Sequence, residues 1–253
     1  LPPNEDSLLR TKKPCPKAES ERQSTFSSPS MMTLLAQHKD LLREVSAVGG
    51  YKVNEILEAD RFHENLVIEH ENNYYWSDHL TNNTYNWTRN YENEVVRMLK
   101  DFAYARWNNE WNSTLTKRVR AGELLVTIGD NFHQKKSVLD LENDDQNKLV
   151  LFSSHDTKVA SILAALDVWN GIFIPYSTSI IFELHQSVAN QTDFYVSVRY
   201  YNETMSLLKT NSSADFKDSY ALSLPDCAQQ TLQIDGQPMC PLERFNEIVR
   251  SFQ

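Results

Sequence analysis

The stretch from Leu149 to His185 reads LVLFSSHDTKVASILAALDVWNGIFIPYSTSIIFELH. Its first four residues are a continuous apolar run, which is typical of a strand buried on both faces of a sheet. The run stops at the polar residues 153–156, SSHD. Apolar residues then return with helical spacing, at Val159, Ile162, Leu163 and Leu166. A strand that leads directly into a helix predicts an α/β fold.

Two more strands and a terminal helix are predicted after the first strand and its helix. Residues 177–184 and 194–201 are the strand candidates, and the second reads FYVSVRYY, which is rich in β-branched and aromatic side chains. The chain closes with an amphipathic helix in which Pro241 suits the first turn. Its apolar stripe consists of Leu242, Phe245, Ile248 and Val249.

The first half of the chain is predicted to be mainly helical. Residues 1–30 are polar and contain several prolines, which indicates an extended connection. Apolar residues at helical spacing predict helices over 34–48, about 94–107 and about 123–132, and Gly49-Gly50 closes the first of them. We therefore expect a mainly helical region over 1–115 and an α/β region over 116–253.

The composition is that of an acidic folded protein. The formal net charge is −9 over 253 residues, and the one notable Lys/Arg cluster, Lys117, Arg118 and Arg120, is interpreted as a solvated helix start. A chain without a basic stripe is a poor candidate for binding nucleic acid or an anionic membrane. No apolar run is long enough to span a bilayer. Eleven Phe, eleven Tyr and five Trp supply burial that a disordered chain lacks.

Sequons and cysteines indicate the secretory pathway. Cys227 and Cys240 flank a short loop with Gly236 and Pro238, so a local disulfide is plausible, and Cys15 is left over. Six N-x-S/T sequons are candidates for glycosylation, at Asn82, Asn86, Asn112, Asn190, Asn202 and Asn211.

His155 and Asp156 are the candidate catalytic residues, because they stand between a predicted strand and a helix N-terminus. Ligands of open α/β sheets bind beyond the carboxyl ends of strands, and the free N–H groups of a helix start suit a phosphate. His155 could donate hydrogen bonds to phosphate oxygens, and a protonated Asp156 could give its proton to a leaving alkoxide. In the alternative reading Asp156 only caps a helix that starts at Thr157, and His155 is a rim histidine of a binding module.

Four motifs resemble the histidine acid phosphatases of animals. They are the stretch 149–185, YYNET at 200–204, LPDC ending at Cys227 and CPLERF starting at Cys240, and they come in that family's order. The resemblance implies a mixed sheet flanked by helices, with 1–115 as a helical cap and 116–253 as the C-terminal half of the phosphatase domain. It also implies a secreted or lysosomal acid phosphatase without metal or organic cofactor, acting on small-molecule or protein phosphate monoesters, and a possible homodimer.

The same resemblance implies a mechanism. In the family, a histidine of an N-terminal RHGxRxP motif attacks phosphorus and becomes phosphorylated. His155 would contact the phosphoryl group, and Asp156 would protonate the leaving group. Arg-His does not occur in these 253 residues. We therefore expect a fragment truncated at both ends that lacks the nucleophile, the N-terminal part of the sheet and the cysteine that pairs with Cys15 in relatives. Such a piece should be inactive alone and weakly soluble. A non-catalytic secreted glycoprotein of the same fold is the alternative.

A metal site is a weaker hypothesis. His63 and His70 lie seven residues apart, on one face of a helix, with Glu64 and Glu71 beside them. The spacing is not HExxH, and the sequence offers no evident third ligand.

Overall fold

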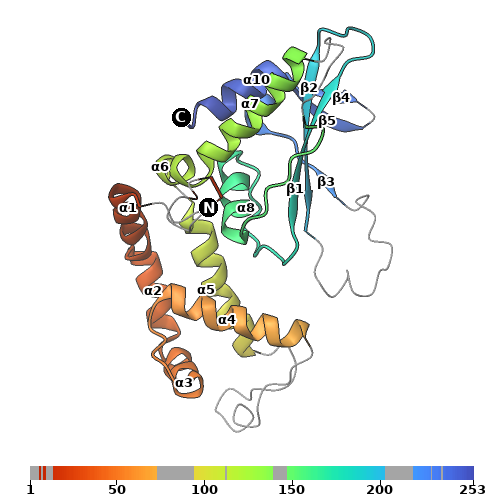
Figure 1. The fold of residues 1–253 in the computed structure, drawn as a ribbon. Coiled ribbons are helices and arrows are strands. Elements are labelled where there is room, and N and C mark those ends of the chain that lie inside the picture. Colours follow the sequence, from red (N-terminus) through yellow and green to blue (C-terminus); the bar gives the residue numbers. More distant parts are fainter. Residues whose placement is uncertain are drawn as a thin grey trace. The chain divides into compact units, whose positions relative to one another are not determined.

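The computed structural model describes residues 6, 8–9, 14–72, 94–111, 113–138, 147–202, 219–228, 230–234 and 236–253. The chain divides into two compact units, which are drawn in Figure 1 and described separately below. The helical unit comprises Pro16–Glu110 and Gly171–Phe173, and the α/β unit comprises Leu1–Cys15, Trp111–Asn170 and Ile174–Gln253.

The helical unit contains α1 (Pro16–Phe26), α2 (Pro29–Gln37), α3 (Lys39–Gly49), α4 (Ile56–Glu71) and α5 (Glu94–Glu110). Its core is an apolar cluster to which α3 contributes Leu41 and Val45, while α5 contributes Leu99 and Phe102. These residues recur at the three- and four-residue spacing of one helix face, so each helix buries one stripe. The helix predicted over about 94–107 is confirmed as α5.

The N-terminal part of this unit differs from the prediction. The expected extended connection over 1–30 is wrong for 16–30, because α1 begins at Pro16 and α2 begins at Pro29. A proline lacks the N–H that the first turn of a helix leaves unpaired, so these two prolines start helices instead of excluding them. The helix predicted over 34–48 is split in two at His38, and its predicted end is confirmed by Gly50, which adopts the left-handed conformation with φ of 69°.

The α/β unit contains the helices that flank the sheet. They are α6 (Thr114–Lys117), the π-helical turn η2 (Arg118–Gly122), α7 (Glu123–Val138), α8 (Asp156–Ala165), the short η4 (Pro225–Cys227) and α10 (Leu242–Arg250). The helix predicted over about 123–132 is confirmed as α7 and is longer than expected. The terminal helix is confirmed as α10, with Pro241 as the residue that precedes it.

The sheet of this unit has the order β1-β2-β5-β4. Its strands are β1 (Ser179–Gln186), β2 (Phe194–Tyr201), β3 (Tyr220–Ala221), β4 (Leu232–Ile234) and β5 (Gln237–Pro241). The described pairings are antiparallel, and β2 has β1 on one edge and both β3 and β5 on the other. Both strands predicted after residue 170 are confirmed, whereas the β4–β5 hairpin was not foreseen.

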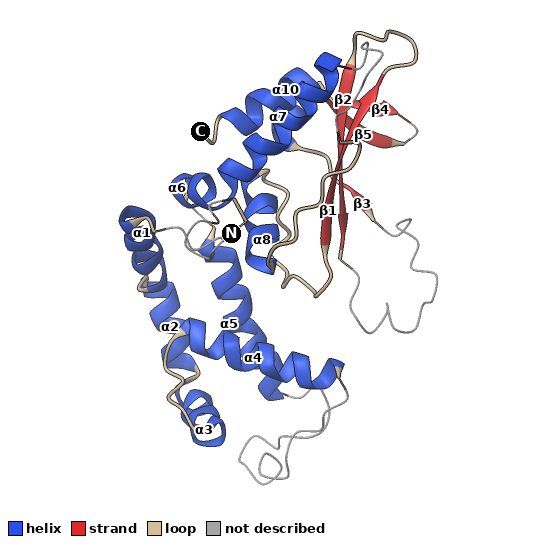
Figure 2. Cartoon of the chain, in the orientation of Figure 1, coloured by secondary structure: helices blue, strands red, loops and turns tan. Residues whose placement is uncertain are grey.

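Helices cover one face of this sheet, as Figure 2 shows for α7, α8 and α10. Alternate residues of β2 point into the core, because successive side chains of a strand face opposite sides. The shared cluster includes Val196 and Val198 of β2, Leu125 of α7, and Phe245 and Ile248 of α10. The α/β fold class is therefore confirmed. None of the helices in the described ranges combines the length and apolar character needed to cross a bilayer.

One predicted element is wrong: residues 149–152 do not form a buried strand. The segment has no regular structure, and Leu149 and Leu151 are 73% and 82% exposed. Only Phe152 packs against the core of the unit. A strand needs a neighbouring backbone to pair with, and no strand of the described residues pairs with this segment. An apolar run alone therefore does not make a strand.

Candidate active site

His155 is the last residue before α8. Its backbone is extended, with φ of −112° and ψ of 160°, and its carbonyl oxygen accepts the first hydrogen bonds of the helix, from Lys158 N at 3.0 Å and Val159 N at 3.2 Å. The side chain is exposed and makes no hydrogen bond within the part of the chain that the structure describes. The imidazole is thus held by its backbone at a helix N-terminus and is open to a ligand.

Asp156 is the first residue of α8. Its Oδ1 accepts a hydrogen bond of 2.5 Å from Thr157 N, and the residue is half-buried. The helix begins one residue earlier than the capping alternative assumed, so Asp156 is not the residue that precedes the helix. A carboxylate in a first turn is favoured by the partial positive charge of the helix start. Its Oδ2 has no hydrogen bond among the described residues, so one oxygen can stabilise the turn while the other meets a ligand.

Two serines precede this pair, and both are exposed. Ser154 Oγ donates a hydrogen bond of 2.8 Å to the carbonyl oxygen of Leu9. Leu9 in turn donates from its backbone N to Asp6 Oδ1 at 2.9 Å, and it packs against the core of the α/β unit. The segment that carries His155 is thereby attached to the N-terminal residues of the unit.

Behind this turn lies a buried cation that the sequence analysis did not identify as buried. Lys158 is 3% exposed, and its Nζ donates a hydrogen bond to the carbonyl oxygen of Arg120 in η2. Arg120 is also buried, so the interpretation of Lys117, Arg118 and Arg120 as a solvated helix start is wrong for Arg120. In the sequence, Lys158 is a single basic residue among small and apolar residues of the helix. That pattern does not show that its side chain is buried or which group it contacts.

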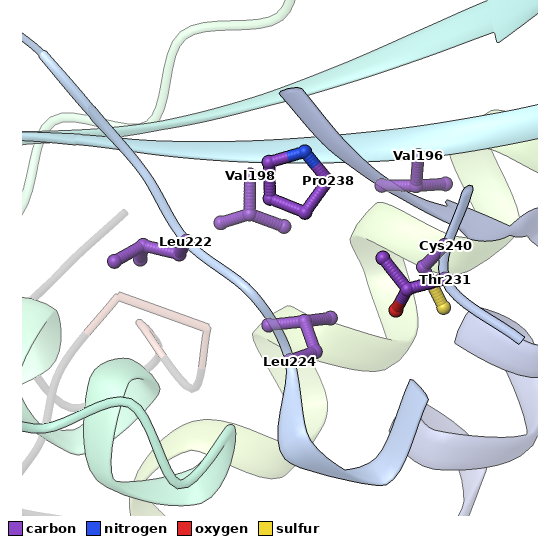
Figure 3. A pocket seen from close by; sticks show the side chains of 7 residues that line it. All are labelled: Val196, Val198, Leu222, Leu224, Thr231, Pro238 and Cys240. Atoms are coloured by element: carbon purple, nitrogen blue, oxygen red, sulfur yellow. The ribbon is translucent and has the colours of Figure 1, made fainter. Parts of the chain in front are cut away.

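Two hollows of the α/β unit do not contain the candidate residues. Figure 3 shows the first, an apolar gap too small for a water molecule, lined by Val196, Val198, Leu222, Leu224, Thr231, Pro238 and Cys240. The second, of about 560 Å³, lies beside Cys15, Gly122 and Phe252. The candidate residues lie at the start of α8, where His155 is exposed and Asp156 is half-buried.

The described residues provide no set of ligands for the metal site considered at His63 and His70. His63 is 3% exposed on α4, and neither ring nitrogen makes a hydrogen bond among the described residues. The side chains of His70 and Glu71 lie outside the described residues. Within the described ranges, no group of three or more His, Cys, Asp or Glu side chains could hold a metal ion.

The predicted disulfide is confirmed, because Cys227 and Cys240 are bonded, with Cα atoms 5.8 Å apart, and Cys15 is a free thiol. Two of the glycosylation candidates are described: Asn190 is exposed in the connection between β1 and β2, and Asn202 is half-buried just after β2. Asn82, Asn86, Asn112 and Asn211 lie outside the described residues. Use of these sequons stays a prediction.

Curated relatives are acid phosphatases. The chain is 25% identical to rat (Rattus norvegicus) prostatic acid phosphatase over 262 residues, which cover 97% of the chain and 56% of the relative. It is 25% identical to human (Homo sapiens) lysosomal acid phosphatase, over 97% of the chain and 50% of the relative. The chain thus spans about half the length of these proteins.

Structural and family comparisons agree with this similarity. A phytase from Klebsiella sp. ASR1 superposes with a TM-score of 0.67 at 11% identity, covering 100% of the chain and 68% of the phytase, which shows a shared fold. Residues 3–201 match the sequence model of the histidine phosphatase superfamily, branch 2. That match includes the two candidate residues and covers most of the chain. The chain therefore belongs to the histidine phosphatase superfamily, branch 2.

Proposed function

We propose that the protein to which this chain belongs is an acid phosphatase, a phosphoric monoester hydrolase that works through a phosphohistidine. The observation that carries the proposal is the pair at the start of α8: an exposed His155 without a hydrogen-bond partner among the described residues, followed by Asp156 with one carboxyl oxygen free of hydrogen bonds in the same part. Membership of the family and similarity to acid phosphatases of animals support it.

In the proposed reaction a histidine outside these residues forms a bond to phosphorus while the ester P–O bond breaks. His155 donates a hydrogen bond to a phosphoryl oxygen and so stabilises the charge that builds up there. Asp156 gives its proton to the departing alkoxide. Water then attacks phosphorus, the phosphohistidine P–N bond breaks, and the Asp156 carboxylate accepts the proton that the water loses. Since Asp156 must start protonated, acid pH favours turnover.

The substrates we propose are phosphate monoesters of small molecules or proteins, and the compartment is the secretory pathway, with a secreted or lysosomal protein as the end point. The Cys227–Cys240 disulfide and the prostatic and lysosomal relatives support this. The same proposal includes three further points. Residues 1–115 form a cap and 116–253 form half of the phosphatase domain. The nucleophile lies outside this chain, and the whole protein is a homodimer.

Leaving-group dependence tests the role of Asp156. A general acid matters for a poor leaving group such as the glycerol of β-glycerophosphate and matters little for p-nitrophenol. Because the second step of the reaction is the same for both esters, the comparison is made on kcat/KM, which reports the first step alone. In the whole protein at pH 5, Asp156→Asn should lower kcat/KM for β-glycerophosphate by roughly 10²–10⁴-fold and lower it far less for p-nitrophenyl phosphate. Asp167→Asn, just beyond the other end of α8, is the matched control.

The outcomes separate the candidate functions. Equal losses of kcat/KM on both substrates in Asp156→Asn, with a matching loss of stability, would support the helix-capping alternative. A whole protein that hydrolyses neither ester would support a non-catalytic glycoprotein of the same fold. Activity of the 253-residue chain alone would contradict the placement of the nucleophile outside it.

A further inference from the structure

Lys158 links the candidate site to the π-helical turn of the same unit. Its backbone N donates to the carbonyl oxygen of His155 at 3.0 Å, while its Nζ donates to the carbonyl oxygen of Arg120 in η2. Lys158 therefore connects the backbone of the candidate phosphate ligand, His155, to Arg120, which lies 38 residues before Lys158 in the chain.

The position is unfavourable for a lysine in two ways. A cation in the first turn of a helix faces the partial positive charge of that helix start. Taking an ammonium group out of water costs several kcal/mol unless hydrogen bonds compensate. Lys158 meets both costs, because it is the third residue of α8 and is 3% exposed. A lysine kept under these conditions needs good acceptors, and a backbone carbonyl offers a charge-assisted hydrogen bond.

The acceptor belongs to an element that is closely packed on one side. η2 is a π-helical turn between α6 and α7, and π-helical turns are frequent at functional sites. Its Gly122 lies against Phe252: a Cβ added to Gly122 would come within 2.6 Å of the Phe252 carbonyl oxygen. The turn is thus confined on this side by the C-terminal residues, and it gives Lys158 a fixed point of attachment.

A second contact holds the lysine from its own helix. Ser161 is fully buried, and its Oγ donates a hydrogen bond of 2.8 Å to the carbonyl oxygen of Lys158. The first turn of α8 is therefore hydrogen-bonded through Lys158 in three directions: to His155, to Ser161 and to Arg120.

We propose that Lys158 is a positioning residue, which holds the first turn of α8 against η2 so that His155 points its imidazole at the bound phosphate. The proposal rests on the proposed phosphatase function. Lys158 does not contact the substrate in this scheme: it fixes the backbone from which His155 and Asp156 extend.

The test compares Lys158→Met, which keeps the length of the side chain but cannot donate, with Lys158→Arg, which keeps the charge and the donors. Lys117→Met is the matched control, because Lys117 Nζ also forms a tertiary contact in this unit, 2.5 Å from Asp167 Oδ1. All variants are made in the whole protein. The readouts are kcat and KM for β-glycerophosphate, inhibition by inorganic phosphate, melting temperature and the NMR signals of the His155 ring.

Lys158→Met should weaken inhibition by inorganic phosphate roughly tenfold, because a misplaced His155 loses its hydrogen bond to the charged phosphate. It should also shift the His155 ring signals in the free protein. Lys158→Arg should stay close to wild type in both readouts, and Lys117→Met should leave both unchanged. Should Lys158→Met lower only the melting temperature, with phosphate inhibition and the His155 signals unchanged, Lys158 is merely structural and the proposal is wrong. Equal losses in Lys158→Arg and Lys158→Met would also overturn it.

The two proposals fail in different ways. If the wild-type whole protein hydrolyses no phosphate ester, the proposed function fails, yet a phosphate titration of the His155 signals still compares wild type with Lys158→Met. If the wild type is active and Lys158→Met binds phosphate equally well, only the positioning role fails.

Discussion

Arg106 donates a hydrogen bond of 2.5 Å from Nη1 to Oδ2 of Asp60, and this ion pair joins α5 to α4 inside the helical unit. Asp60 is 1% exposed, and burial raises its pKa from 3.8 to about 6, although Arg106 acts to lower it. Glu64 raises it further, and a hydrogen bond from Trp107 lowers it. The loss of solvation therefore outweighs the attraction of the partner cation.

The first prediction concerns the stability of the helical unit against pH. A folded-state pKa above the unfolded value means that the folded state binds more protons between pH 3.8 and about 6. The contribution of Asp60 is thus fully present below pH 3.8 and is lost as pH rises through about 6, by on the order of 3 kcal/mol. Asp60→Asn should remove this contribution from the pH dependence of the unit's stability. Hydrogen exchange of α4 amides from pH 4 to 7 measures it, and an unchanged pH slope in the variant would contradict the assignment.

His63 should impose the opposite slope. Burial, with a smaller contribution from the charge of Lys100, lowers its pKa from 6.5 to about 4. The folded state then binds fewer protons than the unfolded state over that interval, so the contribution of His63 is present above pH 6.5 and is lost as pH falls through about 4. His63→Phe removes this loss. Relative to the wild type, the variant should therefore gain more stability at pH 5 than at pH 7. The same exchange experiment reads this out.

Because the two slopes oppose each other between pH 4 and 6, the wild-type unit should be nearly insensitive to pH there. Each single variant should expose the slope of the remaining residue, and the variant with both changes should be flat again. If the stability of both single variants changed with pH in the same direction, the opposing contributions of Asp60 and His63 would be wrong.

The third prediction concerns the disulfide. Under non-reducing conditions a thiol reagent should find one free thiol, Cys15, and three after reduction and unfolding. Cys227 and Cys240 are separated by 13 residues, and opening a loop of this size costs roughly 2–4 kcal/mol. Thermal unfolding with and without reductant should differ accordingly in the α/β unit. A single unchanged transition would mean that the disulfide contributes no stability.

The fourth prediction concerns the solubility of the 253-residue chain. Leu149 and Leu151 are exposed and adjacent to the candidate site, and exposed apolar strand-forming segments favour aggregation. Leu151→Lys should raise solubility without lowering the melting temperature. Phe152→Lys is the matched control: it should destabilise the α/β unit, because Phe152 packs against the core. Solubility limits and thermal melts of the two variants check both statements, and equal destabilisation would show that Leu151 is not free.

Local patterns in the sequence were sufficient for elements with one clear apolar stripe, such as α5, α7 and α10, and for the alternating strand β2. Apolar spacing did not predict the structure correctly where a segment's conformation depends on residues distant in the sequence. Residues 149–152 have the composition of a strand but lack a paired neighbour among the described residues. The helix α4 was assumed only in the metal hypothesis and was not predicted from an apolar stripe, because the polar residues Asp60 and His63 lie on its buried face. At the site, the sequence placed His155 and Asp156 at a helix start, but it could not show that Lys158 is buried on η2.

The central place of β2 in the sheet has a consequence for folding kinetics. β1 and β2 are joined by the short connection 187–193 and pair along all eight residues, so their contacts are local in sequence. β5 meets β2 at Tyr195 and Val196, which pair with Pro241 and Cys240, about 45 residues further along the chain. Because closing a long loop costs more entropy than closing a short one, we expect the β1–β2 hairpin to form before β5 docks. Pulse-labelling hydrogen exchange during refolding should then protect amides of β1 and β2 first, and oxidation of Cys227 and Cys240 should speed up the second step.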